Sequence, residues 1–242
     1  MESWTGLWRQ DPGFGGGGGV KAELLDEVIA ARHERRAIAV VTHLATGKQH
    51  LVTREAAAID PILDKAFRFD KSGVEQTPDG EVFIAIYNPK LRLVIIGAVL
   101  IAQSVIPMAE ALGYDVTVID PRGAFATGAR FPNVTLHADW PDDVLPTLQL
   151  DARSAVLALT HDPKIDDPAL DLTLRSQAFY IGALGSKKTQ GARVERLTAR
   201  GFDASQISRI HGPIGLNIGA VGAPEIAISI MAEMTKCLRL GE

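Results

Sequence analysis

Apolar runs alternate with helically spaced apolar positions along the second part of the chain, from residue 90 onward. The runs predict strands over Leu91–Ile96, Asp115–Ile119, Val134–His137, Ala155–Leu159 and Phe179–Ile181. The helical spacing predicts helices over Ala98–Leu112, Asp142–Leu148, Asp167–Ser176, Lys188–Arg200 and Pro224–Leu238. Because such alternation is typical of a parallel sheet covered on both faces, residues 90–242 are predicted to be an α/β, Rossmann-like, doubly wound domain with a mostly parallel sheet.

Residues 20–89 show a less regular pattern, which predicts a small α+β module ending near Pro89. The expected elements are helices over Lys21–Arg36 and from Pro61, and strands over Ala37–Thr42, Gln49–Thr53 and Glu81–Tyr87. Residues 1–19 end in five consecutive glycines, which lose much backbone entropy on ordering, so they are predicted to be a flexible tail.

Composition and charge exclude several classes of protein. Hydrophobic residues make up 46% of the chain and charged residues 22%, which is typical of a globular protein. A net charge of −4 argues against nucleic acid or an anionic membrane as partner, and no apolar run is long enough to span a bilayer. The single cysteine excludes a disulfide-stapled scaffold and a cysteine metal cluster, so the cytoplasm is the expected compartment.

Ligands of doubly wound domains bind at the carboxyl ends of the strands, so the loops there form the candidate site. The first loop contains Gly97, Ala98 and Val99. Val99 stands where a dinucleotide-binding loop has its second glycine, and its branched side chain should crowd a pyrophosphate. Asp120, after the second strand, is open to two interpretations: contact with a nucleotide ribose, or capping of its own turn.

The later loops add polar groups. Thr160, His161 and Asp162 follow the fourth strand and can orient a polar ligand, although Asp166 or Asp167 could instead cap the next helix. After the fifth strand come two glycines and a basic helix start, which suit a phosphate or another oxyanion: Gly182, Gly185, Ser186, Lys187 and Lys188. A long glycine-rich loop from His211 through Gly215 precedes the last helix and is a further candidate.

Together, the last three loops resemble the XdhC/CoxI family of accessory factors for xanthine dehydrogenase and carbon monoxide dehydrogenase. The resemblance covers about residues 90–238 and is carried by Thr160-His161-Asp162, Tyr180-Ile181-Gly182-Ala183-Leu184-Gly185-Ser186-Lys187-Lys188-Thr189 and Ile210-His211-Gly212-Pro213-Ile214-Gly215-Leu216-Asn217-Ile218-Gly219-Ala220. This chain departs from many members in having Val99-Leu100 where they have Gly-His, and in lacking a Gly-Gly-Cys segment.

The resemblance implies a chaperone for the molybdenum cofactor (molybdopterin) that delivers it to an apo molybdenum hydroxylase. A homodimer and a cysteine desulfurase as a further partner are also expected, with no catalytic residue and no metal ligand in this chain. The candidate residues of all four loops would contact the cofactor: Gly97, Ala98, Val99, Asp120, Thr160, His161, Asp162, Gly182, Gly185, Ser186, Lys187, Lys188, His211 and Gly215.

Two other functions stay open. An NAD(P)-dependent oxidoreductase is suggested by the strand, the Gly97 loop and Asp120, with NAD(P) as the alternative cofactor. A nucleotide-sensing Rossmann module is the other, dimeric through the last helix, where Ile226, Ile230, Met231 and Met234 recur at helical spacing. Such a stripe is more often part of the core.

Cys237 lies near the end of the last predicted helix, away in sequence from the candidate loops. It is interpreted as a packing residue and not as a reactive thiol. Replacing Cys237 with Ser is therefore expected to leave cofactor binding intact.

Overall fold

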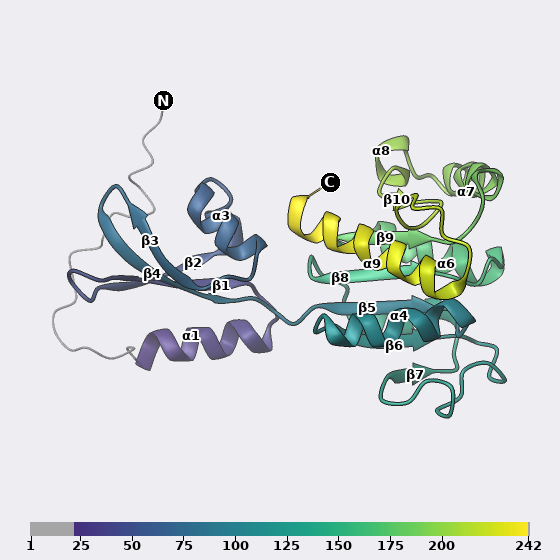
Figure 1. Ribbon diagram of the computed structural model, residues 1–242, viewed down its shortest axis with the longest axis horizontal. Helices are drawn as coiled ribbons and strands as arrows, with labels where there is room; N and C mark the ends of the chain where they lie inside the picture. Colours follow the sequence, from purple (N-terminus) through teal and green to yellow (C-terminus); the bar gives the residue numbers. More distant parts are fainter. Residues whose placement is uncertain (1–21, 242) are drawn as a thin grey trace. The chain divides into compact units, whose positions relative to one another are not determined.

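The computed structural model describes residues 22–241, and the predicted tail over residues 1–19 lies outside them. The chain forms two compact units, Met1–Pro89 and Lys90–Glu242 (Figure 1). No helix among the described residues is long and apolar enough to cross a membrane.

The first unit is a four-stranded antiparallel sheet in the order β2-β1-β4-β3. Its elements are α1 (Ala22–His33), β1 (Ile38–His43), β2 (Gln49–Thr53), α2 (Arg54–Ala57), α3 (Pro61–Arg68), β3 (Gly73–Thr77) and β4 (Gly80–Tyr87). Alternate residues of β1 face opposite sides, so Val40 packs with α1 and Val41 with α3. Asp60 caps α3, and Pro61 opens it as the sequence predicts.

The prediction missed β3 because only Val74 among its five residues is a large apolar one. The strand forms by pairing with β4 across a tight turn at Gly80, where the backbone has a φ of +110°. The sequence Pro78-Asp79-Gly80 is a turn signal that could have revealed this hairpin.

The second unit is a six-stranded, fully parallel sheet in the order β10-β9-β8-β5-β6-β7, which confirms the predicted doubly wound fold. Its elements are β5 (Arg92–Ile96), α4 (Leu100–Ala111), β6 (Asp115–Ile119), β7 (Thr135–His137), α5 (Pro141–Leu148), β8 (Ser154–Ala158), α6 (Pro163–Leu174), β9 (Tyr180–Ala183), α7 (Lys187–Ala199), α8 (Ala204–Ile207), β10 (Ile210–His211) and α9 (Ala223–Leu240).

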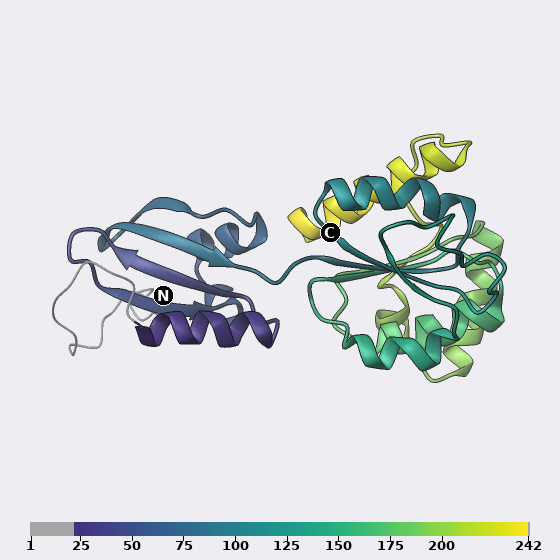
Figure 2. The same ribbon diagram turned by 90° about the horizontal axis from the view of Figure 1, so that it is seen from below.

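Helices cover both faces of this sheet (Figure 2). On one face, α4 and α9 pack on Leu93 and Ile95 of β5. On the other face, α5 and α6 pack on Val94 and Ile96 of the same strand. Because both faces are buried, the strand reads as a continuous apolar run, which is why its position could be predicted from the sequence.

Some details of the prediction for the second unit were wrong. Helix α6 begins at Pro163, four residues before the predicted start, because Asp162 caps it and accepts a hydrogen bond from the Lys164 N–H at 2.9 Å. Asp166 and Asp167 are therefore not caps. Strand β10 was not predicted, since it contributes only two residues to the sheet edge.

The apolar stripe of α9 belongs to the core of the second unit. Ile230, Met231 and Met234 are buried in the same cluster as the apolar face of α4, and Ile226 packs against that cluster. The stripe is thus satisfied within the chain, as is most common for such patterns.

Candidate functional site

The order of the parallel strands reverses between β5 and β8, so their carboxyl ends meet at the topological switch point of the sheet. Gly97 follows β5 and Thr160 follows β8. Gly97 has a φ of +114°, and a Cβ atom placed there would lie 2.8 Å from Cγ2 of Thr160. Gly97 is therefore required both by its backbone conformation and by the close approach of the two loops.

Asp120 is completely buried and joins the first two loops. Oδ2 of Asp120 accepts a hydrogen bond from the Ala98 N–H at 2.7 Å, and Oδ1 accepts one from the Arg122 N–H at 3.0 Å. The guanidinium of Arg122 adds a bidentate ion pair, at 2.9 and 2.8 Å. The predicted turn cap is thus present, and the exposed member of the pair is Arg122.

The electrostatics of Asp120 follow from these contacts. Burial alone raises the pKa of its carboxyl, but the hydrogen bonds from Arg122 and from the Ala98 N–H outweigh burial and hold the pKa below its usual range. Asp120 is therefore ionised, and its charge is balanced by Arg122.

A second buried carboxylate, Asp166, lies under the Thr160 loop. Oδ1 of Asp166 accepts a hydrogen bond from Oγ1 of Thr160 at 2.7 Å, while Oδ2 is buried without a hydrogen-bond partner among the described residues. Burial raises the pKa of Asp166, although Thr160 and the nearby cation Arg193 oppose the shift. The neighbouring Asp167 forms an ion pair with Arg196, at 2.5 Å and 3.0 Å.

The loops after β9 and β10 enclose a pocket of about 500 Å³. The pocket is lined by Leu184, Gly185, Lys187, Pro213, Ile214, Gly215, Leu216, Asn217, Ile218, Gly219, Ala220, Ile226 and Ser229. Among these residues there is one cation, Lys187, and no acid. The wall is otherwise made of apolar side chains, an amide, a hydroxyl and peptide groups, so the pocket suits an anionic ligand with an apolar or ring-shaped body.

The amino end of α7 borders this pocket. Ser186 caps the helix, and its Oγ accepts a hydrogen bond from the Thr189 N–H at 3.2 Å. The first N–H groups of a helix carry partial positive charge and have no acceptor inside the helix. Over the described part of the chain, Lys187 and Lys188 form no ion pair, which leaves both ammonium groups available to an anion.

A third group of side chains ties the last loop to α9. Oε2 of Glu233 accepts hydrogen bonds from the Tyr180 hydroxyl at 2.5 Å and from the Gly215 N–H at 2.8 Å. Oε1 of Glu233 lies 3.4 Å from Nδ1 of His211, whose ring stacks on Tyr180 with 4.6 Å between centroids. Sγ of Cys237 lies 3.7 Å from Nε2 of His211.

A family model described as the XdhC Rossmann domain matches residues 93–234, which is more than half of the chain. The chain belongs to the XdhC Rossmann domain family. The resemblance seen in the loops of the sequence is thereby confirmed.

Curated relatives agree with this assignment. The chain is 29% identical over 221 residues to the uncharacterized protein YqeB of Escherichia coli (90% of this chain and 37% of the relative). It is 30% identical over 148 residues to the molybdenum cofactor insertion chaperone PaoD of Escherichia coli (61% and 40%). It is 32% identical over 154 residues to a probable subunit of xanthine dehydrogenase from Bacillus subtilis (63% and 44%).

A solved structure described as a xanthine dehydrogenase from Bacillus halodurans resembles the chain with a TM-score of 0.65 and 26% identity. The similarity covers 91% of this chain and 65% of that structure. The chain spans between 37% and 44% of the length of the curated relatives.

The predicted site residues lie in two different places in the XdhC domain. Gly97, Ala98, Asp120 and Thr160 lie together at the switch point, whereas Gly185, Lys187 and Gly215 line the pocket two strands away. Gly182 lies inside β9, where a Cβ atom would meet Cδ1 of Ile214 at 2.4 Å, so its role is packing. Val99, Asp162 and Ser186 are the residues before α4, α6 and α7, and His161 lies in the loop after β8. Lys188 lies in the first turn of α7, and His211 is the last residue of β10.

Sequence reasoning missed several residues of the site: Arg122, Asp166, Arg193, Tyr180 and Glu233. Arg122 stands two residues after the candidate Asp120, and its charge next to a carboxylate at a strand end was a usable signal. Cys237 packs against the core cluster, as the sequence analysis expects, and its Sγ also lies 3.7 Å from Nε2 of His211, a contact that the sequence analysis did not anticipate.

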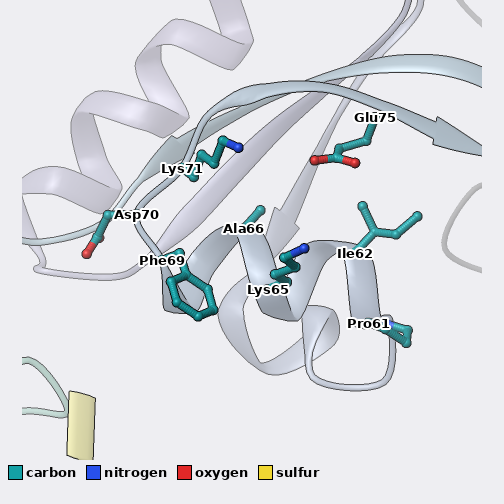
Figure 3. A pocket seen from close by; sticks show the side chains of 8 residues that line it. All are labelled: Pro61, Ile62, Lys65, Ala66, Phe69, Asp70, Lys71 and Glu75. Carbon is teal, nitrogen blue, oxygen red and sulfur yellow. The ribbon is translucent and has the colours of Figure 1, made fainter. Parts of the chain in front are cut away.

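A larger pocket, of about 680 Å³, lies in the first unit between α3 and β3. Figure 3 shows Lys65, Lys71 and Glu75 directed toward its interior. The pocket contains none of the predicted site residues and lies outside the matched family span. Pocket volume alone thus favours a binding site in the first unit, whereas the chemistry of the loops indicates one in the second unit.

Proposed function

We propose that this XdhC domain binds the molybdenum cofactor and assists its insertion into a molybdenum hydroxylase of the xanthine dehydrogenase type. The observation that carries the proposal is the pocket at the carboxyl edge, which has one lysine and no acid in its wall and lies at the start of α7. The relative PaoD, which is named a molybdenum cofactor insertion chaperone, supports the same function.

The residues present fit such a ligand. The molybdenum cofactor is a pterin with a phosphate, and a phosphate suits the first N–H groups of α7 together with Lys187. The peptide groups of the Gly215–Gly219 loop and the side chain of Asn217 can hydrogen-bond a polar ring, and Ile218 can pack on its face. The bound cofactor supplies the redox chemistry of the hydroxylase, whereas this chain would bind and orient it.

Anaerobic uptake of molybdopterin tests the proposal. The full chain is incubated with molybdopterin released from a molybdenum enzyme, separated from free ligand by gel filtration, and assayed for pterin by fluorescence. We expect the pterin to elute with the protein in a saturable amount. If the protein neither copurifies with molybdopterin nor takes it up, the proposal is wrong.

A nucleotide-binding module is the second candidate, because the Gly97 loop lies at the topological switch point where doubly wound folds bind nucleotides. Asp120 weighs against it, since that carboxylate is buried and bound to Arg122 and Ala98. Titration with NADH and NADPH distinguishes the two functions, and we expect no saturable binding of either.

The hydroxylase partner is a proposal as well, and the cysteine desulfurase and the homodimer stay predictions.

A further inference from the structure

Cys237, His211 and Glu233 do not line the pocket beside α7, although Glu233 accepts a hydrogen bond from the Gly215 N–H of its wall. Sγ of Cys237 lies 3.7 Å from Nε2 of His211, and Nδ1 of His211 lies 3.4 Å from Oε1 of Glu233. The thiol of Cys237 thus contacts the imidazole of His211, and that imidazole contacts the carboxylate of Glu233. This is the arrangement of a nucleophile, its base and the acid that orients the base.

The imidazole of His211 is held in place on two sides. Its ring stacks on Tyr180, and Glu233 is itself fixed by the Tyr180 hydroxyl and the Gly215 N–H. Burial alone raises the pKa of Glu233, but the hydrogen bonds from His211, Tyr180 and Gly215 outweigh it and lower the pKa. A carboxylate facing Nδ1 stabilises the tautomer with its proton on Nδ1, so that Nε2 is left as the acceptor facing the thiol.

The position of Cys237 in α9 shows why a base is needed to form its thiolate. Cys237 is in the last turn of the helix, where the Gly241 N–H donates a hydrogen bond to its carbonyl at 3.0 Å. The carboxyl end of a helix carries partial negative charge and disfavours a thiolate. The protonated imidazole of His211 would supply the opposite charge. Cys237 and His211 are both partly exposed residues, and Cys237 also packs against the core cluster of α4 and α9.

We propose that Cys237, His211 and Glu233 form a thiol–disulfide exchange site for low-molecular-weight disulfides. Nε2 of His211 takes the proton of the Cys237 thiol, and the thiolate attacks one sulfur of the disulfide. A new S–S bond to Cys237 forms while the bond between the two original sulfurs breaks. The leaving thiolate takes the proton from His211, so Cys237 is oxidised and the small disulfide yields one free thiol.

The sequence makes this proposal easy to test, because Cys237 is the only cysteine in the chain. The full protein is incubated with oxidised glutathione at neutral pH, and intact-mass spectrometry follows the addition of one glutathionyl group. We expect the folded protein to react about tenfold faster than the chain unfolded in urea, whose thiol has an ordinary pKa and is mostly protonated. A folded protein that reacts no faster than the unfolded chain overturns the proposal.

Two variants test whether His211 and Glu233 activate the thiol or whether the thiol reacts only because it is exposed. His211→Phe keeps an aromatic ring against Tyr180 but removes the base, and it should lower the rate to that of the unfolded chain or below. Glu233→Gln keeps the size of the side chain but removes the charge that orients His211, and it should lower the rate by a smaller factor. Circular dichroism confirms that each variant is folded.

The ultraviolet absorbance of the thiolate provides a readout that a packing role would not change. We expect an excess absorbance in the wild-type protein over Cys237→Ser at neutral pH, and we expect His211→Phe to lose it. Equal absorbance in the wild-type protein and Cys237→Ser, or unchanged reaction rates in both His211→Phe and Glu233→Gln, would show that Cys237 is only a packing residue. None of these measurements depends on cofactor binding, so the exchange site and the proposed function can fail separately.

Discussion

The two units of the chain bury polar side chains to very different extents. Among residues 22–241, the first unit buries only His43 and Asp60, and Asp60 is a helix cap. The second unit buries Asp120, Ser154, Asp166, Asp167, Thr173, Arg193 and Ser229. Four of these are charged, and they lie after β6, on the first turns of α6 and on α7. Since a buried charge costs free energy unless it is paired, this concentration supports our proposal that the second unit is the binding part of the chain.

Pocket volume gives the opposite ranking. The larger pocket is in the first unit, at about 680 Å³, and the pocket beside α7 is about 500 Å³. The first unit thus has more space, and the second has the organised charge. We favour the second unit as the place of the site, because a ligand is recognised by a few fixed donors and acceptors and not by volume.

The strongest test of this comparison is the removal of one carboxylate from each unit. Asp120→Ala leaves the Ala98 N–H and the Arg122 guanidinium without their acceptor, and it should lower the stability of the second unit by about 3 kcal/mol. Asp64→Ala removes the partly exposed partner of Arg54 and Arg68 in the first unit, and it should cost less than about 1 kcal/mol. Hydrogen exchange read by mass spectrometry reports each unit through its own peptides. Similar losses in the two units would contradict the comparison.

Two glycines of the same loop test how tightly the site is built. Gly215 has a φ of +88°, and a Cβ atom there would lie 2.3 Å from Oγ of Ser229, so Gly215→Ala should cost about 2 kcal/mol from backbone strain and overpacking. Gly219 has a φ of +76° but nothing within 4 Å, so Gly219→Ala introduces strain alone and should cost about 1 kcal/mol. Thermal unfolding measures the loss of stability in both variants. Equal losses would show that the loop moves away from Ser229 and avoids the close contact.

Acid should weaken the second unit through Asp120. The pKa of this carboxyl is lower in the folded chain than in the unfolded one, since Arg122 and the Ala98 N–H outweigh its burial. Its contribution to stability is therefore complete above the unfolded pKa, about 4, and is lost as the pH falls through the lower folded pKa. Asp120→Asn should flatten this part of the stability profile between about pH 5 and pH 3. Urea unfolding across that range provides the measurement, and parallel profiles would exclude this role for Asp120.

The sequence predicts well where apolar patterning decides the structure. The strands β5 and β8 are nearly continuous apolar runs, and β6 alternates apolar with polar residues, so their positions and the loops after them could be predicted. The two residues of β10 and the polar face of β3 carry no such pattern, and these strands depend on the neighbours with which they pair. Boundaries set by a cap were missed where two candidates were close, as with Asp162 and Asp166.

Contacts between distant residues could not be predicted from spacing. His211 and Cys237 are 26 residues apart, and they meet only because α9 packs along β9 and returns past the edge strand. Arg193 comes near Asp166 for a similar reason, because α6 and α7 lie side by side. Such pairs are products of tertiary packing, and a single sequence contains no local signal for them.

The smallest predicted effect is a change in ligand affinity, and it tests directly which of the two pockets binds molybdopterin. Lys187→Gln removes the only cation in the wall of the pocket beside α7, and it should weaken molybdopterin binding about fivefold, the equivalent of about 1 kcal/mol for one exposed charge on a phosphate. Lys71→Gln is the matched control, since it removes one lysine from the wall of the larger pocket in the first unit. Anaerobic equilibrium dialysis measures both dissociation constants. An unchanged constant in Lys187→Gln together with a weakened one in Lys71→Gln would move the ligand to the first unit, and it would show that the pocket with the larger volume is the binding site.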